Sequence, residues 1–548
     1  MSFTSRIVNR LMKLPPAETH NFVRTRDLRI PMPDGVILLA DHYAPRSGPK
    51  RPTVLVRSPY GRRGLFASIY ALPFVTHGYQ VLIQSCRGTA GSGGDFVYVR
   101  NEQSDGLATI DWIKQQAWFS GELAMVGGSY LGFVQWAIAA EAGPEMKALV
   151  PAITTSDTNH FRYQSGSLTL EPMLNWSTMM TRTAASGPKV RDMPGQSRQE
   201  RQLEQAYAHL PLGEADRAAI GQPSSHFQDV ISHSPDDDYW KPIDFSARVG
   251  EVKVPIALQA GWYDLFLQWQ LQDYQRLRAA GQQPFLLIGP WFHGEFPSFA
   301  ASVADSLAWL NAQVKGDSSS LRERPVRLFV MGANQWRDFA DWPPPARSER
   351  WHLQPNGALA QDGPPASEPD RYRYDPADPT PTVGGNSLGA RKRMGRKDNR
   401  ALEARQDVLV YTSAALQQDM EIIGPLTAEL YVRSSLEHTD FFARLCVVQA
   451  SGKSINLCDG ILRLTPGSVT PEPDSSLHIA IEVWPTAYHF RKGERIRLQV
   501  SSGAHPHFAR NNGSGEPPST GTKLCVAEQV VYHDPDHPSA VLLPVFSA

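Results

Sequence analysis

The chain is poor in cysteine and lacks long apolar runs. Its 548 residues include only four cysteines, Cys86, Cys446, Cys458 and Cys525, and none forms a C-x-x-C pair. Few, scattered thiols are typical of a reducing compartment and have no metal-binding spacing. No stretch reaches the roughly 18 apolar residues of a transmembrane helix, and residues 1–22 lack the apolar centre of a signal peptide. We therefore expect a cytoplasmic protein with no membrane partner and no metal.

An excess of charge of one sign is also missing. Lys and Arg number 54 and Asp and Glu number 55, so the formal net charge is −1. A nucleic-acid-binding surface needs a basic patch or stripe, and the sequence contains none. With 41% hydrophobic and 20% charged residues, the composition is that of an ordinary globular protein. Nucleic acid is therefore excluded as a partner, and the length predicts about three domains.

The first half of the chain has the pattern of an α/β domain with an insertion. Short apolar runs alternate with helical spacing over residues 1–154 and again over 246–319. Such runs are typical of a parallel sheet that is covered on both faces by helices. Residues 155–245 contain helical stretches at 171–184 and 198–209 but no strand run, which predicts a helical cap inserted into the α/β core.

The second half, residues 320–548, has an all-β pattern. Alternating or β-branched runs, such as VRLFV at 326–330, are separated by Pro, Gly and Asp at short intervals. This pattern predicts a β-sandwich or jelly roll. The stretch 355–406 is rich in Pro, Gly and Asp and is expected to be a long surface loop.

The N-terminal residues have the spacing of a short amphipathic helix. Ile7, Leu11 and Met12 would lie on one side of it. We expect this apolar side to pack on the rest of the protein.

The clearest catalytic signal is LAMVGGSYLG at residues 123–132. An apolar strand leads through glycines into a serine and an apolar helix, the context of a nucleophile elbow. The tight turn lifts the Ser129 hydroxyl clear of the sheet, and Gly127 avoids the clash of a β-carbon. The helix that follows directs its first N–H groups at the reacting centre, so the Tyr130 N–H is a candidate oxyanion donor. Since Leu131 replaces the last glycine of G-x-S-x-G, a plain Gly-Gly-Ser loop stays open.

A serine nucleophile needs a base, and the base needs an orienting acid. In α/β-hydrolases the order is Ser, acid, His, each just beyond a strand end. After Ser129, the run VPIALQA at 254–260 is followed by Asp264, and the run PFLLIG at 284–289 is followed by His293. Asp264 could instead cap a helix, but three suitable residues in this order predict a catalytic triad.

The same segments resemble the cocaine esterase and X-prolyl dipeptidyl aminopeptidase family of α/β-hydrolases, the CocE/NonD type. In that family the nucleophile motif is G-x-S-Y-x-G, which accommodates Leu131. The resemblance implies an α/β-hydrolase core, an inserted helical cap, a C-terminal jelly roll and no cofactor. The motifs that carry it are VRSPY (56–60), SCRGT (85–89), GGSYLG (127–132), GWYD (261–264), GPWFH (289–293), MGANQWR (331–337) and FARNN (508–512).

The resemblance also implies that a tyrosine hydroxyl after an early strand is the second oxyanion donor, which matches Tyr60. From the residues alone, Tyr60 follows the strand run 53–56 and a Ser-Pro turn, so a structural role in the turn stays open. A phenol is a suitable donor because it is neutral at pH 7 and bonds strongly to an anion.

The substrate is expected to be a small-molecule ester with an apolar or aromatic acyl group. Relatives that accept amino acid esters carry carboxylates just after the catalytic acid, whereas this chain has Phe266 and Leu267. Apolar groups cannot compensate an ammonium that loses its water. Candidates for the pocket walls are Trp136, Phe161, Trp176, Trp262, Phe266 and Leu267.

Two alternatives remain open at the level of sequence. One is an amide-cleaving member of the family, either an X-Pro dipeptidyl peptidase or a β-lactam acylase. The other is a non-catalytic binding protein whose jelly roll carries the function. The sequence also leaves open whether the chain forms a homo-oligomer.

Overall fold

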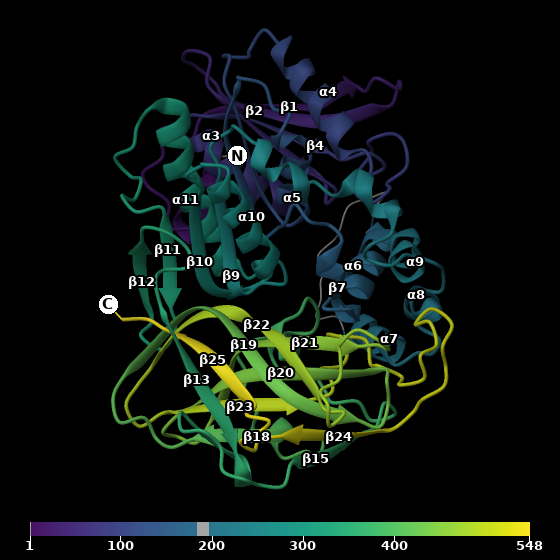
Figure 1. The fold of residues 1–548 in the computed structure, drawn as a ribbon. Coiled ribbons are helices and arrows are strands. Elements are labelled where there is room, and N and C mark those ends of the chain that lie inside the picture. The colour runs from purple at the N-terminus through teal and green to yellow at the C-terminus, as the bar shows by residue number, and fades with distance from the viewer. Residues whose placement is uncertain (1, 184–196, 548) are drawn as a thin grey trace. The chain divides into compact units, whose positions relative to one another are not determined.

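A computed structural model describes residues 2–183 and 197–547. The described residues divide into two units, and each unit contains most of one large sheet (Figure 1). The first unit comprises the described residues of Met1–Asn159, Met179–Met193 and Asp236–Arg327, and the second those of His160–Thr178, Pro194–Pro235 and Leu328–Ala548.

The apolar runs of the N-terminal half form a ten-stranded sheet in the order β1-β2-β4-β3-β5-β6-β9-β10-β11-β12. Its central strands, from β4 through β10, pair in parallel, while β1 and β2 are antiparallel. The strands are β1 (Phe22–Pro31), β2 (Ile37–Pro45), β3 (Thr53–Ser58), β4 (Gln80–Ser85), β5 (Leu123–Gly128), β6 (Met146–Ala152), β9 (Ala257–Tyr263), β10 (Phe285–Phe292), β11 (Val326–Val330) and β12 (Gln335–Phe339).

Helices cover this sheet on both faces, as predicted for a doubly wound domain (Figure 1). Val54, Val56 and Val126 face a core shared with α11, whereas Arg57 points to the other face and contacts α4. The helices of the first unit are α1 (Ser2–Leu11), α2 (Leu65–Tyr70), α3 (Leu72–Thr76), α4 (Glu102–Lys114), α5 (Tyr130–Ala139), α10 (Leu267–Ala279) and α11 (Phe296–Lys315).

The region between β6 and β9 is helical, as expected. The predicted stretch 198–209 is α7, and 171–184 is α6, although residue 184 lies outside the described residues. Most of this insertion groups with the second unit, and the unit boundary falls within α6. The elements are α6 (Leu170–Thr183), α7 (Ser197–Tyr207), α8 (Ala215–Ile220), α9 (Ser225–Ser232), and the short strands β7 (Tyr163–Gln164) and β8 (Ser167–Leu168).

Polar contacts within the second unit explain this grouping. The carboxylate of Glu171 in α6 is buried and accepts a 2.7 Å hydrogen bond from Arg393 Nε. The N–H of Gly213 donates to the carbonyl of Ser519. The insertion therefore shares its interior with residues that come more than 150 positions later in the chain. The range 155–245 that the sequence predicts for a separate cap coincides with neither unit.

The C-terminal half forms the predicted β-rich domain, an 11-stranded sheet in which nearly all pairs are antiparallel. Strand β22 pairs with β19, outside the linear order β15-β24-β19-β25-β13-β14-β18-β23-β20-β21. The strands are β13 (Arg347–Gln354), β14 (Ala358–Ala360), β15 (Asp370–Tyr374), β18 (Leu409–Ser413), β19 (Met420–Ser434), β20 (Thr439–Val448), β21 (Ser454–Leu464), β22 (Leu477–Phe490), β23 (Arg495–Ser501), β24 (Ala527–Tyr532) and β25 (Ala540–Val545).

Two expectations about this half differ from the structure. The run 326–330 is a strand, as predicted, but β11 and β12 continue the sheet of the α/β core, and the unit boundary falls within β11. The stretch 355–406 is not a plain loop, because it contains the sheet strands β14 and β15, a hairpin of β16 (Gly385–Asn386) and β17 (Met394–Gly395), and helix α12 (Arg400–Glu403). Its buried Tyr372 and Tyr374 anchor it in the domain.

The N-terminal helix forms, but it packs on a different side from the one predicted. Met12 is buried, whereas Ile7 and Leu11 are 43% and 61% exposed. The packed side is Ser5 and Asn9 with Met12, and Asn9 Nδ2 donates to Thr76 Oγ1 at 3.1 Å. The packed side therefore combines one hydrogen bond to α3 with the apolar contacts of Val8 and Met12 in the core. Among the described residues, no helix has both the length and the apolar character to cross a membrane.

Candidate active site

The turn between β5 and α5 has the strained backbone of a nucleophile elbow. Ser129 adopts φ 60° and ψ −128°, a region that residues with a side chain rarely occupy. Gly127 has φ 152°, and a β-carbon there would lie 2.5 Å from Cβ of Leu131. At Gly132 a β-carbon would lie 2.5 Å from Cγ2 of Thr154. Both glycines therefore let the first turn of α5 approach the sheet closely enough to present Ser129.

The acid and the base follow two neighbouring parallel strands. Asp264 comes directly after β9, and His293 comes directly after β10. Gly261 and Gly289 are paired in the register of these strands, and the Trp291 indole packs where their side chains would be. Its Nε1 donates to the Ala260 carbonyl at 3.0 Å, so the tryptophan holds the two strand ends that carry the acid and the base.

The structure brings Ser129, His293 and Asp264 into one hydrogen-bonded chain. His293 Nδ1 lies 2.8 Å from Asp264 Oδ2, and His293 Nε2 lies 3.1 Å from Ser129 Oγ. An ionised carboxylate only accepts hydrogen bonds, so Nδ1 is the donor and neutral Nε2 presents its lone pair to the serine hydroxyl. Asp264 is fully buried, and its Oδ1 accepts the Phe266 N–H at 2.9 Å. The arrangement can move a proton from the serine to the histidine.

The two predicted oxyanion donors lie in different local settings. Tyr60 is half-buried and stacks on Phe66 with ring centroids 5.3 Å apart, and its N–H donates to Ser58 Oγ at 3.1 Å. Tyr130 is the first residue of α5, and its side chain is buried. Burial and the nearby Glu102 carboxylate raise the pKa of the Tyr130 phenol well above its usual value. Their roles as oxyanion donors stay predictions.

Of the four pocket candidates in the first unit, Phe266 is the best placed. Its ring is half-buried and meets the His293 imidazole edge to face, with centroids 5.6 Å apart. Trp136, Trp262 and Leu267 are each at most 3% exposed and pack in the interior. The contribution of all four residues to a pocket wall stays a prediction, although Phe266 contacts His293.

The other two candidates belong to the second unit. Phe161 is 4% exposed, and the guanidinium of Arg162 lies 5.1 Å from its ring centroid. Trp176 is half-buried and packs edge to face against His226 at 5.0 Å. Their role in substrate binding also stays a prediction.

The sequence analysis missed a buried ionic network beside the triad. Arg57 and Glu102 are 0% and 4% exposed, and Arg57 Nη1 lies 2.8 Å from Glu102 Oε2. A signal for one partner is present in the sequence, because Arg57 comes directly after the apolar run 53–56, which is expected to be a buried strand. A charge at such a position requires a partner. The identity of that partner, 45 residues later, cannot be inferred from spacing.

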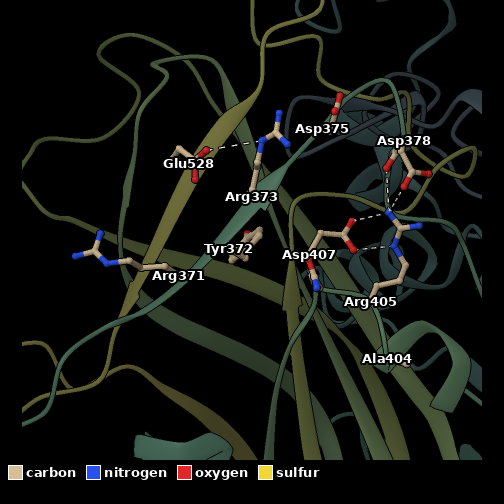
Figure 2. Close-up of a pocket in the computed structure, with 10 residues that line it drawn as sticks. Arg371, Tyr372, Arg373, Asp375, Asp378, Ala404, Arg405, Asp407 and Glu528 are labelled. Atoms are coloured by element: carbon tan, nitrogen blue, oxygen red, sulfur yellow. Dashed lines mark hydrogen bonds and ion pairs between the residues drawn. The ribbon is translucent and has the colours of Figure 1, made fainter.

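The second unit has a hollow of about 710 Å³ beside β15, lined by charged side chains (Figure 2). Arg405 pairs with Asp407 at 2.7 Å and with Asp378 at 3.1 Å. Arg373 lies 3.8 Å from Glu528. These groups satisfy one another, so the hollow gives no argument for a charged ligand. Within the described residues, no cluster of three or more His, Cys, Asp or Glu side chains is placed to hold a metal ion.

The sheet, the strained serine and the acid–base chain define an α/β-hydrolase of the serine type. Residues 34–295 match the X-Pro dipeptidyl-peptidase (S15 family), and residues 321–542 match the X-Pro dipeptidyl-peptidase C-terminal non-catalytic domain. The chain is 31% identical to cocaine esterase from Rhodococcus sp. (strain MB1 Bresler), over 96% of this chain and 99% of the relative. It belongs to the cocaine esterase/X-prolyl dipeptidyl aminopeptidase family of hydrolases, as the sequence motifs predicted.

Solved structures confirm the predicted fold. An α-amino acid ester hydrolase superposes with a TM-score of 0.84 at 22% identity, covering 96% of this chain and 97% of the other. An aminopeptidase from a marine sediment Thaumarchaeota archaeon superposes with a TM-score of 0.82 at 22% identity, covering 97% and 98%. At this identity the likeness concerns the α/β-hydrolase core and the C-terminal β-rich domain.

Proposed function

We propose that this chain is a serine esterase that cleaves small-molecule carboxylic esters through an acyl-enzyme intermediate. The observation that carries the proposal is the hydrogen-bonded chain from Ser129 through His293 to the buried Asp264, with distances of 3.1 and 2.8 Å. The strained backbone at Ser129 supports it, because strain of this kind persists where a function requires it. The cocaine esterase relative, aligned over nearly the whole chain, favours an ester as substrate.

In the proposed reaction, His293 Nε2 takes the proton of Ser129 as Oγ bonds to the ester carbonyl carbon. The carbonyl oxygen becomes an oxyanion, held by the Tyr130 N–H and the Tyr60 hydroxyl, each worth about 3–4 kcal/mol. Asp264 stabilises the imidazolium. His293 then protonates the leaving alcohol as the C–O bond breaks, which leaves the acyl group on Ser129. Water, deprotonated by His293, releases the acid by the same steps.

We further propose that the acyl group is apolar or aromatic. The half-buried Phe266 ring contacts the catalytic imidazole, so an acyl group bound next to it meets an aromatic edge. The fully buried Leu267 follows it, and neither side chain carries a charge that could pair with an ammonium. An amino acid ester or an N-terminal dipeptide carries an ammonium that would lose its water without compensation. These positions therefore favour a neutral acyl group.

Parallel assays with p-nitrophenyl esters and Gly-Pro-p-nitroanilide test the proposal. We expect kcat/KM for the butyrate or benzoate ester to exceed that for the anilide by at least about 100-fold, and a fluorophosphonate to label the wild type but not Ser129→Ala. If the anilide is turned over faster than the esters, the chain is a dipeptidyl peptidase and the proposal of an esterase is wrong. A chain that neither turns over nor is labelled would be a binding protein. Both reagents report on chemistry at Ser129, whatever the natural ester.

A further inference from the structure

A buried carboxylate joins the two segments that carry the predicted oxyanion donors. Glu102 begins α4 and is 4% exposed. On one side, its Oε2 and its carbonyl oxygen each lie 2.8 Å from Arg57 Nη1. The Arg57 guanidinium is fully buried, and its Nε also donates to Gln84 Oε1 at 2.7 Å. The guanidinium is therefore fixed by two neighbouring elements of the sheet domain.

On the other side, the same carboxylate holds Tyr130. Glu102 Oε1 accepts the Tyr130 hydroxyl at 2.8 Å, and that hydroxyl accepts the Val99 N–H at 3.2 Å. The phenol is thus both donor and acceptor in fixed directions. Burial and the Glu102 carboxylate raise the pKa of this phenol well above its usual value, which favours the neutral form that donates the hydrogen bond. The ring of the residue next to Ser129 cannot rotate or shift without breaking a buried bond.

Both ends of this network lie next to groups that the proposed mechanism uses. Tyr130 follows Ser129 directly, and its backbone N–H is one proposed oxyanion donor. Arg57 lies three residues before Tyr60, the other donor, and the buried Ser58 between them accepts the Tyr60 N–H. We propose that Glu102 is a positioning residue, which sets the spacing of the two oxyanion donors through Arg57 and Tyr130. This inference rests on the proposed serine esterase function and deepens it.

The physical character of the network fits this role better than a role in stability. A buried ion pair gains little net stability, because both charges lose their water. The directional hydrogen bonds of its members, from Arg57 to Gln84 and the Glu102 carbonyl and from Tyr130 to Glu102 Oε1, fix their positions. Oxyanion donors act only when they lie about 2.7–3.1 Å from the developing charge, so a narrow geometry is what they require. Gly106 of α4 leaves the necessary room, because a β-carbon there would lie 3.1 Å from Arg57 Nη1 and 2.7 Å from Ile138 Cγ2.

The variant Tyr130→Phe tests the inference, because it removes the bond to Glu102 while keeping the ring and the backbone N–H. The matched control is Tyr79→Phe, which also removes a buried phenol donating at 2.8 Å, here to Asn311 Oδ1. The readouts are kcat and KM with p-nitrophenyl butyrate, counted per site titrated with a fluorophosphonate. Inhibition by phenylboronic acid is measured too, because its adduct with a serine is anionic and tetrahedral, like the transition state.

We expect Tyr130→Phe to lower kcat per titrated site about 10-fold and to weaken boronate binding by a similar factor, with KM changed less than about 2-fold. Tyr79→Phe should leave all three values within about 2-fold of the wild type. Glu102→Gln, which keeps an acceptor for the phenol but removes the charge opposite Arg57, should also lower kcat.

The melting temperatures separate positioning from stability. Suppose that Tyr130→Phe and Tyr79→Phe both have a lower melting temperature than the wild type. If Tyr130→Phe then keeps the wild-type kcat and boronate affinity, Glu102 has a structural role only and the inference is wrong. Should Glu102→Gln fail to fold, Tyr130→Phe still decides. Failure of the proposed function looks different, because then the wild type itself shows no turnover and no labelling.

Discussion

Replacing the buried carboxylate of Asp264 by an amide tests whether the triad works as its geometry indicates. In the wild type, Asp264 Oδ2 faces His293 Nδ1 at 2.8 Å and Oδ1 accepts the Phe266 N–H at 2.9 Å. In Asp264→Asn only one of these atoms can remain an acceptor. If the amide oxygen keeps the Phe266 N–H, the amino group faces Nδ1 and forces the ring proton onto Nε2. Nε2 then faces Ser129 with a hydrogen and cannot take its proton.

The expected fall in kcat of Asp264→Asn follows from two lost interactions of His293. For His293 to act as a base, its ring proton must move back from Nε2 to Nδ1. This breaks the buried hydrogen bond between the new amide and Nδ1 and costs about 2 kcal/mol. The imidazolium of the transition state also loses a charge-assisted bond to a carboxylate, worth about 1.5–3 kcal/mol. Together these amount to about 3.5–5 kcal/mol, or a fall in kcat of roughly 4 × 10²–5 × 10³-fold with little change in KM. A serine-protease triad loses a comparable factor on the equivalent change.

The assay is steady-state hydrolysis of p-nitrophenyl butyrate, with the folded fraction checked by melting temperature. Asp244→Asn is the matched control, because Asp244 Oδ1 accepts the Ser246 N–H at 2.9 Å in the same kind of local turn but has no histidine partner in the described structure. We expect this control to keep the wild-type kcat. An Asp264→Asn protein that is folded and retains kcat within tenfold of the wild type would refute the reasoning.

Two further predictions concern specificity and pH. Phe266→Ala should lower kcat/KM for a benzoate ester at least about 5-fold more than for an acetate ester. The control Phe285→Ala, which changes an equally half-buried ring away from the triad, should leave the ratio of the two kcat/KM values unchanged. Equal losses on both esters in Phe266→Ala would argue against an aromatic acyl site. Burial, with the charge of Arg444, lowers the pKa of His507 to about 3, so the unfolded chain binds more protons between pH 6.5 and 3. The contribution of the neutral, buried His507 to the free energy of unfolding is complete above pH 6.5, and it falls by about 2 kcal/mol by pH 5. His507→Phe should therefore lose less thermal stability than the wild type between pH 8 and 5, and parallel losses would contradict the assignment.

The three residues of the proposed triad could be singled out from the sequence because their positions depend on local patterns and a topological rule. Ser129, Asp264 and His293 each follow an apolar run, and in a parallel sheet the carboxyl ends of the strands meet at one edge. Glycine at 127 is also a local signal, since the tight turn leaves no space for a side chain. The strands of the β-rich half could be predicted because their alternating or β-branched runs are also local patterns.

Features that depend on distant partners were decided only by the tertiary structure. Glu102 is paired with Arg57 and Tyr130, which come 45 residues before and 28 after it, and no periodicity links them. The N-terminal helix shows the same limit, because its packed side combines the hydrogen bond from Asn9 to Thr76 with the contacts of Val8 and Met12, and Leu11 faces solvent. The run 326–330 was assigned to the wrong sheet for the same reason, since the sequence of a strand does not show which neighbour it pairs with. Sequence determines which groups must be buried, whereas folding decides which partner each group finds there.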